Sequence, residues 1–439
     1  MNNFDLIVIG SGPGGYTTAA TAAAKGLNVA IVERDLLGGT CLNRGCIPTK
    51  ALCRSAEVAL TVKEAGDFGV DTNCCSINYA SMASRKDRIV EELRQGVETE
   101  LRNVTVIHGE ALFESADTIS VNGDTYHAPR IIVATGSIPA SLNVDGAELA
   151  VNSDFMLSSS ILPQSLIIIG GGVIGMEFAS IYSALDVDVT VIEYCKEILP
   201  PFDPDIAKRL RMSMKRRGVK FITSAQVTSI VNKDTETTVE YECKGKTASV
   251  SSQTVLMAVG RTPVIPHGLT ELGIKRNKQA IAVDENMQTS IPGIYAIGDV
   301  NGLCMLAHAA EVQGRVALGM ERLSNIIPSA VFTVPECAMA GLTEQQCIDC
   351  GIPYATAQST FRSNGKAVTM GQTDGMVKVI VNADTHAILG VHICGAHAAD
   401  LIQEAVTAMN AGLTATQAAG AVHGHPTLSE TLMNAFRMI

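Results

Sequence analysis

The sequence feature that most constrains the fold is a unit of strand, glycine turn and helix that occurs twice. The first unit has the apolar run 6–9, the turn GSGPGG and a helix predicted over 16–25. The second has the apolar run 166–169 and the turn GGGVIG, again before a helical stretch. Each member lies 160 positions after its counterpart. A continuous apolar run is typical of a strand buried on both faces, so the repeat predicts an α/β fold with an internal duplication.

Both glycine turns have the GxGxxG spacing of dinucleotide-binding folds. The first glycine makes the tight turn, the second lets the backbone approach a pyrophosphate, and the third allows close packing of the helix. The strands that follow, predicted over 28–32 and 187–192, each end in an acid that would bind a ribose hydroxyl. One chain is therefore expected to bind two dinucleotides. The predicted binding residues are Gly10, Gly12, Gly15 and Glu33 in the first copy, and Gly170, Gly172, Gly175 and Glu193 in the second.

A further motif, GGTCLNRGCIPTK over 38–50, carries two cysteines with four residues between them. On a straight helix Cys41 and Cys46 would be separated by about 7.5 Å of rise, beyond the roughly 4.4 to 6.8 Å between Cα atoms that a disulfide tolerates. A bridge therefore needs a bent segment, which Gly45 and Pro48 could supply. A strained disulfide here would suit redox exchange. By spacing alone, two buried thiols or half of a metal site are equally compatible.

The composition limits the classes of partner. The net charge is −11 and no long basic run occurs, which argues against nucleic acid or an anionic membrane. Twelve cysteines are scattered without a repeating framework, as is typical of a reducing compartment. Neither a signal peptide nor a membrane-spanning run is expected, so the predicted location is the cytoplasm, or an organelle if a targeting segment has been removed.

The rest of the chain is predicted to complete these folds and to add a third domain. A long amphipathic helix is expected over 84–102, because Ile89, Leu93, Val97 and Leu101 recur every four residues and would form its apolar face. A further helix is expected over 200–220, with strands between 226 and 254. Alternating strand patterns over 376–381 and 388–393 mark a C-terminal region without a glycine turn. The expected division is 1–145 and 265–327 for the first nucleotide-binding domain and the central part, 146–264 for the second nucleotide-binding domain, and 328–439 for the C-terminal domain.

Two nucleotide folds with a CxxxxC motif directly after the first resemble the pyridine nucleotide-disulfide oxidoreductases. The resemblance covers essentially the whole chain, and it is strongest to the branch that oxidises dihydrolipoamide with NAD. It implies two Rossmann-like domains, the first for FAD and the second for NAD, followed by an α+β dimerisation domain. The motifs that carry it, in the family's order, are GGTCLNRGCIPTK, GGGVIGMEFAS, IYAIGDV, MLAHAAEVQG and HGHPTLSE.

The resemblance implies roles for the cofactor-binding residues. Glu33 would bind the adenosine ribose of FAD, Asp299 a ribitol hydroxyl, and Lys50 would lie beside the flavin with Glu177 as its ion partner. Glu193 would bind NAD and reject the 2′-phosphate of NADP. The flavin ring would contact the backbone at Met305, Leu306, Ala307 and His308; Ala111, Thr135 and Gly136 would complete the FAD site, and Val227 and Gly260 the NAD site.

The resemblance also supplies an acid–base group. His425 would exchange protons with the substrate thiols, and Glu430 would fix its tautomer. A second interpretation of Glu430 is structural, because Thr427 to Glu430 has the spacing of a capping box. His423 and His425 could suggest a metal, but no matching cysteine or carboxylate cluster accompanies them, so zinc is not expected. In this family the histidine serves the other subunit, which implies a homodimer.

The implied activity is oxidation of protein-bound dihydrolipoamide, with Cys41 and Cys46 as a redox disulfide and NAD⁺ as the final acceptor. The implied partners are lipoyl domains of a 2-oxo acid dehydrogenase or glycine cleavage complex. One alternative is an NAD(P)H-dependent reductase of another disulfide, such as glutathione disulfide. Another is a redox-sensing flavoprotein whose dithiol state controls a binding surface.

Three residues depart from the family's usual pattern. Asp186 and Ala111 stand where glycines are usual, and Arg44 stands between the two cysteines in place of the commoner valine. Asp tolerates a left-handed backbone better than most residues. The remaining cysteines that were considered are expected to be structural, including the CxxC pair in a short helix predicted between Thr343 and Gly351: Cys53, Cys74, Cys75, Cys347, Cys350 and Cys394.

Overall fold

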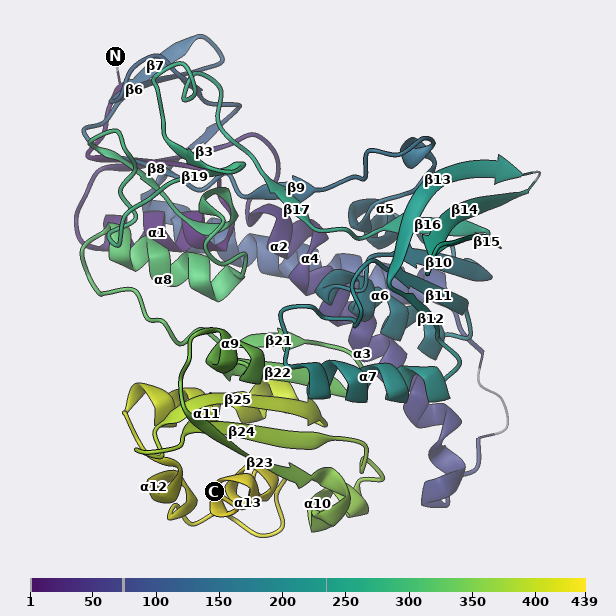
Figure 1. Ribbon diagram of the computed structural model, residues 1–439. Coiled ribbons are helices and arrows are strands. Elements are labelled where there is room, and N and C mark those ends of the chain that lie inside the picture. The colour runs from purple at the N-terminus through teal and green to yellow at the C-terminus, as the bar shows by residue number, and fades with distance from the viewer. Residues whose placement is uncertain (1, 73–75, 234) are drawn as a thin grey trace.

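The protein is described by a computed structural model that covers residues 2–72, 76–233 and 235–439. Cys74 and Cys75 lie outside these residues, so their expected structural role is not described. The chain forms three parts (Figure 1): one at the upper left with the N-terminus, one at the right, and a C-terminal part below. No helix in the described ranges is long and apolar enough to cross a membrane.

A five-stranded parallel sheet organises the first part, in the order β20-β8-β2-β3-β4. Its central strands are fully buried, as the continuous apolar runs predict. Strand β20 lies after the second copy in the sequence, so the first part is built from two separate stretches of chain. The strands are β2 (Leu6–Ile9), β3 (Val29–Glu33), β4 (Thr105–His108), β8 (Ile131–Val133) and β20 (Ile294–Ala296).

Helices and small sheets surround this sheet. Helices α1 and α8 run beside one another below it (Figure 1). The helices are α1 (Pro13–Ala24), α2 (Gly39–Arg44), α3 (Cys46–Lys63), α4 (Tyr79–Glu100) and α8 (Ala307–Ala317). The minor strands are β1 (Asn2–Asn3), β5 (Leu112–Phe113), β6 (Thr118–Val121), β7 (Asp124–His127), β18 (Arg276–Asn277) and β19 (Ala280–Ile281).

The second part repeats the parallel arrangement, in the order β12-β11-β10-β16. Its strands are β10 (Ser165–Ile169), β11 (Asp188–Glu193), β12 (Lys220–Thr223) and β16 (Thr254–Met257). An antiparallel sheet follows, with β13 (Ala225–Lys233), β14 (Glu236–Cys243) and β15 (Lys246–Ser252). The helices are α5 (Ser153–Ser158), α6 (Val173–Ala184) and α7 (Pro204–Arg216). Strands β9 (Ser137–Pro139) and β17 (Arg261–Pro263) pair and join the two parts.

The two copies share their backbone geometry, which confirms the duplication predicted from the sequence. Gly10 and Gly170 have left-handed φ angles of +100° and +106°. The same correspondence links Gly26, at φ +88°, with Asp186, at φ +65°. Asp186 therefore has a left-handed backbone where a glycine is usual, a conformation that Asp tolerates better than most residues. Its carboxylate accepts a hydrogen bond from Lys63 Nζ at 2.7 Å.

The helix expected over 84–102 is present as α4, but it starts earlier than expected and its buried face differs in part from the expected one. Helix α4 begins at Tyr79, because the side chain of Asn78 caps it by accepting from Ser81 N. Val97 is buried as expected, but Leu93 is 44% exposed, and Val90 is buried instead. Which apolar residues of α4 are buried therefore depends on the elements that pack against the helix, and not on apolar character alone.

The C-terminal part is an antiparallel sheet in the order β21-β22-β25-β24-β23, covered by helices. The predicted cap of α9 is confirmed: Thr343 and Gln346 form a capping box, and Cys347 is buried. The strands are β21 (Ser329–Val331), β22 (Glu336–Gly341), β23 (Tyr354–Thr360), β24 (Met376–Asn382) and β25 (Ile388–Gly395). The helices are α9 (Glu344–Asp349), α10 (Gly365–Thr369), α11 (Ala398–Asn410), α12 (Ala415–Ala419) and α13 (Glu430–Arg437).

A buried charge cluster joins the C-terminal sheet to the second copy. Lys378 on β24 is 1% exposed, and its Nζ donates to Asp203 at 3.0 Å, Asp205 at 2.8 Å and Glu344 at 2.6 Å. Asp203 caps α7 and is itself fully buried. Helix α7 is thereby fixed against β24 by an ammonium that serves three carboxylates.

Candidate active site

One cavity of about 2,140 Å³ contains both glycine turns and the cysteine motif. Pockets for a single small molecule are usually roughly 300 to 1,000 Å³, so the volume suits two large ligands. Its walls come from the first residues of α1, α3 and α6 and from the ends of the parallel strands. Ligands bind at this edge of open α/β sheets.

The second glycine of each turn faces open space in the cavity. A β-carbon added to Gly12 or Gly172 would meet no protein atom within 4 Å, whereas one added to Gly15 or Gly175 would lie about 2 Å from the carbonyl oxygen of the turn's first glycine. Gly12 and Gly172 have ordinary φ angles of −64° and −74°. The absence of a side chain at these two positions therefore leaves room for a ligand rather than for the protein backbone.

The two terminal acids are held in the same way. Glu33 Oε2 accepts hydrogen bonds from the backbone and hydroxyl of Ser11 at 2.8 and 2.6 Å, and its Oε1 accepts from Asp35 N at 2.9 Å. In the second copy, Glu193 accepts from the N–H groups of Gly171 and Cys195 at 2.5 and 2.6 Å. Each carboxylate is therefore fixed beside its own glycine turn, and the donor residues in the two copies are at corresponding positions, 160 residues apart in the sequence.

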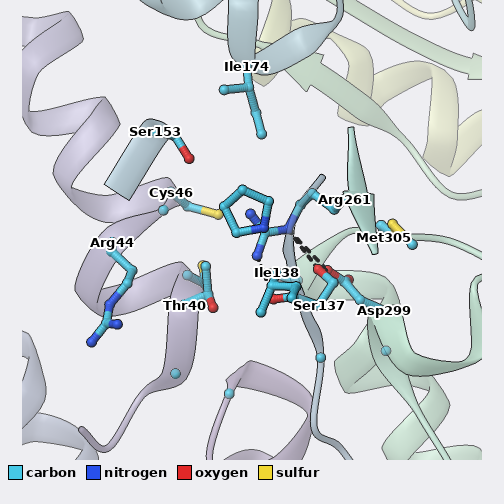
Figure 2. A pocket seen from close by; sticks show the side chains of 18 of the residues that line it. Thr40, Arg44, Cys46, Ser137, Ile138, Ser153, Ile174, Arg261, Asp299 and Met305 are labelled. Atoms are coloured by element: carbon cyan, nitrogen blue, oxygen red, sulfur yellow. Dashed lines mark hydrogen bonds and ion pairs between the residues drawn. The ribbon is translucent and has the colours of Figure 1, made fainter. Parts of the chain in front are cut away.

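The helix break at Gly45 brings the two cysteines together. Helix α2 ends at Arg44, Gly45 adopts φ −141° and ψ −115°, and α3 starts at Cys46. This is the bend that the CxxxxC spacing requires. Both residues are free thiols, with Cys46 exposed to the cavity and Cys41 half-buried. In Figure 2 the sulfur of Cys46 points into the cavity.

The two thiols differ in acidity. A hydrogen bond from the Cys41 thiol lowers the pKa of Cys46 to about 7, with a further contribution from the positive charge of Lys50. The same hydrogen bond, together with burial, raises the pKa of Cys41. A thiolate near neutral pH is therefore expected on Cys46, which makes it the better leaving group of the pair.

Lys50 and Glu177 form an ion pair within the cavity. Lys50 Nζ lies 2.8 and 3.0 Å from the two carboxylate oxygens of Glu177. Glu177 is 3% exposed, so its carboxylate is buried in the protein and does not belong to a pair on a helix surface. Burial alone would lower the pKa of Lys50, but the Glu177 carboxylate outweighs it and the pKa is raised. Lys50 is therefore a stable cation one helical turn from Cys46.

Asp299 lies in a network that was not predicted from the sequence. Ser137 Oγ donates to Asp299 Oδ2 at 2.5 Å, and Arg261 donates to Ser137 Oγ and to its carbonyl oxygen, both at 2.7 Å. Arg261 Nε also lies 3.8 Å from Asp299 Oδ2. Figure 2 shows these three side chains together on the wall opposite Cys46. The arginine from the second copy thus fixes a carboxylate in the first.

The other expected cofactor-binding residues also line this cavity. Gly136 and Gly260 have left-handed φ angles and open space where a β-carbon would lie, and His308 is oriented by a hydrogen bond of 2.8 Å between Nε2 and the carbonyl of Pro328. Ala111 is buried, so its methyl group fits where a glycine is usual. The remaining lining residues of the expected set are Thr135, Met305, Leu306, Ala307 and Val227.

Arg44 does not add its charge to the thiol pair. Its guanidinium pairs with Asp35 at 2.5 Å and extends away from Cys46 (Figure 2). The groups that shift the pKa of either cysteine do not include it.

His425 and Glu430 form a dyad that does not line the cavity. His425 Nδ1 lies 3.0 Å from Glu430 Oε1, and Thr427 N donates to Glu430 Oε2 at 2.9 Å. Both interpretations of Glu430 therefore hold in part, because one oxygen contacts the histidine and the other a backbone N–H. These contacts lower the pKa of Glu430. The His425 side chain is 78% exposed, so its Nε2 is accessible to another chain.

Comparison with known proteins accounts for this arrangement. Residues 4–314 match the pyridine nucleotide-disulphide oxidoreductases, and residues 327–436 match the dimerisation domain of the same family. The chain belongs to this family. It is 38% identical to dihydrolipoyl dehydrogenase of Bacillus subtilis, covering 98% of this chain and 96% of that protein. It is 39% identical to that of Chlamydia muridarum, covering 97% and 95%.

The solved structures point to the same family. HOCl-induced flavoprotein disulfide reductase RclA from Escherichia coli, in its Cu(II) complex, superposes with a TM-score of 0.90 at 28% identity and covers all of both chains. FAD and NAD are the cofactors of the pyridine nucleotide-disulphide oxidoreductases. The open space at both second glycines and the two anchored acids fit a pair of dinucleotides.

Family motifs and spacing did not reveal every residue at the site. Ser137 and Arg261 follow the two strand–turn motifs IIVATG and VLMAVG, and a polar residue directly after such a turn is the signal that could have found them. Ser11 and Phe332 carried no such signal, because their contributions come through hydrogen bonds and packing between distant segments.

Proposed function

We propose that the protein oxidises dihydrolipoamide to lipoamide and reduces NAD⁺ to NADH. The observation that carries the proposal is the thiol pair at the helix break, which shares one cavity with both dinucleotide turns and the Lys50–Glu177 ion pair. The identity to dihydrolipoyl dehydrogenases over nearly the full length supports the choice of substrate.

We assign FAD to the first copy and NAD to the second. Glu33, Lys50 and Asp299 would contact FAD, together with the turn at Gly12. Glu193 and the turn at Gly172 would contact NAD. The five-stranded sheet that combines residues before and after the second copy supports a division into 1–145 and 265–327 for the FAD half, 146–264 for the NAD half and 328–439 for dimerisation.

In the first chemical step, a substrate thiolate attacks Cys41 Sγ of the oxidised pair. A bond forms between the substrate and Cys41, and Cys46 leaves as a thiolate, which its lowered pKa favours. His425 of the partner subunit accepts the proton of the attacking thiol, with Glu430 holding its Nδ1 so that Nε2 faces the substrate.

In the second step, the remaining substrate thiol attacks the substrate sulfur bonded to Cys41. The cyclic disulfide of lipoamide forms, and Cys41 leaves and takes up the proton of that thiol, as its raised pKa favours. The pair then holds two electrons as a Cys41 thiol and a Cys46 thiolate. FAD, when bound, supplies the two-electron transfer between this pair and NAD⁺.

The direct test is an assay of NADH formation from NAD⁺ and dihydrolipoamide by the flavin-loaded protein, with NADP⁺ as the paired control. We expect rapid NADH formation and little NADPH. Negligible turnover by protein that holds a reducible flavin would exclude dihydrolipoamide as the substrate.

The role of the partner's histidine has its own test. A heterodimer of one Cys46→Ser subunit and one His425→Gln subunit would keep one of its two sites intact, so about half of the activity should remain. Each homodimeric variant should be nearly inactive. Activity of the heterodimer at the level of the homodimeric variants would show that His425 serves its own subunit.

A second candidate, reduction of another disulfide, is favoured by the superposition with RclA over the whole chain. The discriminating experiment supplies NADH or NADPH with glutathione disulfide or lipoamide. A specificity constant higher for glutathione disulfide than for lipoamide would favour this alternative.

Further proposals concern partners and location. We propose that the substrate is carried on lipoyl domains of a multienzyme complex and that the protein is a homodimer, which the match to the dimerisation domain supports. The described cysteines are free thiols, which fits a reducing compartment, and we propose the cytoplasm.

A further inference from the structure

Phe332 contacts both members of the Lys50–Glu177 ion pair from the C-terminal part of the chain. Its backbone N–H donates to Glu177 Oε1 at 3.1 Å, and Lys50 Nζ lies 4.6 Å from the centre of its ring. A cation within about 6 Å of an aromatic centroid is attracted to the ring face. One residue therefore fixes the acid through its main chain and the ammonium through its side chain.

The segment that carries Phe332 is anchored on α6 at two points. Besides the bond to Glu177, Val334 N donates to Ser180 Oγ at 3.0 Å. Glu177 and Ser180 are 3% and 4% exposed and lie one turn apart on the helix. The ring of Phe332 is consequently held by its own backbone in contact with Lys50.

Lys50 connects this segment to the thiol pair. On α3 it lies four residues after Cys46, a spacing that places two side chains on one helix face. The charged or titratable groups that act on Cys46 are Cys41, Lys50 and Glu177, and those that act on Lys50 are Glu177, Cys46 and Cys53. Lys50 is the cation of this set, so its position determines how much positive charge Cys46 experiences.

We propose that Phe332 is a positioning residue that holds the Lys50 ammonium beside Cys46, so that the C-terminal domain sets the charge environment of the thiol pair. The inference rests on the proposed role of Cys46 as a thiolate leaving group. It does not depend on the identity of the disulfide substrate.

The experiment measures alkylation of Cys46 by iodoacetamide as a function of pH in the reduced, flavin-loaded protein without substrate. The modified peptide is quantified by mass spectrometry. Phe332→Leu keeps an apolar side chain but removes the ring. The midpoint pH of Cys46 alkylation should therefore rise by about 0.5 unit, and the alkylation rate at pH 7 should fall about two-fold. Phe332→Tyr, which retains the ring, should follow the wild-type profile.

Two controls separate positioning of Lys50 from general loosening of the segment. Ser180→Ala removes one of the two anchors but keeps the Phe332 ring and its bond to Glu177, so it should shift the profile less than Phe332→Leu does. In a Lys50→Met background, Phe332→Leu should have no further effect. Phe332→Met is measured in parallel, so that the test remains possible if the leucine variant does not fold.

Four results would overturn the proposal: an unchanged profile in Phe332→Leu and Phe332→Met, a tyrosine variant that behaves like leucine, an equal shift in Ser180→Ala, or an effect that persists without Lys50. Because no substrate is present, these results differ from a failure of the proposed function, which would appear as absent lipoamide turnover with a normal alkylation profile.

Discussion

Gly12 and Gly172 hold equivalent positions in the two copies, and a β-carbon at either would meet no protein atom within 4 Å. The space beside each glycine is open, as the binding of a ligand would require. This pairing gives a test of the two dinucleotide sites that separates binding from folding.

We expect Gly12→Ala and Gly172→Ala to unfold near the wild-type temperature, because their φ angles suit alanine. Gly12→Ala should weaken FAD binding and Gly172→Ala should raise the KM for NAD⁺, each by about five-fold to a hundred-fold, as expected from overpacking of about 1–3 kcal/mol. Flavin titration and steady-state kinetics measure these effects. Gly10→Ala is the contrast, since its β-carbon would lie 2.4 Å from the Ala134 carbonyl oxygen and should destabilise the fold. Wild-type FAD affinity in Gly12→Ala would contradict the assignment.

The acidity of Cys46 depends on the thiol of Cys41. The pKa of Cys46 is lowered to about 7, so about half of the Cys46 thiols should be thiolates at pH 7. The thiolate fraction should increase above this pH and decrease below it. Cys41→Ala removes the hydrogen bond with the largest effect, so the midpoint of Cys46 alkylation should rise toward the ordinary thiol value. Cys41→Ser keeps a donor and should shift the midpoint less. Equal midpoints in the two variants would show that the donor has no role.

Glu193 should determine the choice between NAD and NADP. The cavity-lining residues between 193 and 227, in this described part of the chain, include no lysine or arginine, so a 2′-phosphate would meet a carboxylate without a compensating charge. Glu193→Gln should therefore raise kcat/KM for NADP⁺ relative to NAD⁺ by about ten-fold. Glu33→Gln, the equivalent change in the first copy, should leave that ratio unchanged. A ratio that moves equally in both variants would refute the role of Glu193.

The sequence predicted the repeated elements of the fold well, because each copy carries local signals that do not depend on the other. Apolar strands, glycine turns and terminal acids fall where spacing placed them, and Asp186 adopts the left-handed backbone of its counterpart Gly26. Leu93 on α4 was predicted to be buried and is exposed, since the face of a long helix is chosen by neighbours that a single sequence does not show.

The contacts between the three parts were beyond sequence reasoning. Arg261 reaches Ser137 across 124 residues, and Phe332 reaches Glu177 across 155. No motif encodes such pairs, because their members lie on separate elements that meet only in the folded chain. The ion pair of Lys50 with Glu177 could be expected only through the family resemblance.

Lys378 should be essential for stability. Replacing it with methionine would leave the fully buried Asp203 without its cation, and removing one partner of a buried pair typically costs about 3–5 kcal/mol. Chemical denaturation measures the loss. Lys208→Met, on the exposed face of α7, is the matched control and should change stability by less than about 0.5 kcal/mol.

The same cluster predicts a pH dependence of stability. Burial raises the pKa of Asp203, but the hydrogen bond and charge of Lys378, together with His392 and the backbone N–H of Asp205, outweigh burial, and the net shift is downward. The folded state therefore gains stability above the unfolded pKa of roughly 3.9, and loses it as pH falls through the lower folded value. Without Lys378 the acid unfolding midpoint should move to higher pH. An unchanged midpoint would show that the pair contributes nothing to acid resistance.

The contacts of Lys378 with Asp203 and Asp205 at the start of α7 also limit which domains can be exchanged between relatives. A chimera that imports the second nucleotide-binding copy from another flavoenzyme would place a foreign helix start against β24, and the ammonium would meet whatever that helix supplies. Exchange of this copy should therefore succeed only when the imported copy has carboxylates at positions 203 and 205, or when β24 is exchanged along with it. The two copies share a common backbone, yet they are not interchangeable, because the second copy carries the carboxylates that contact Lys378 on β24.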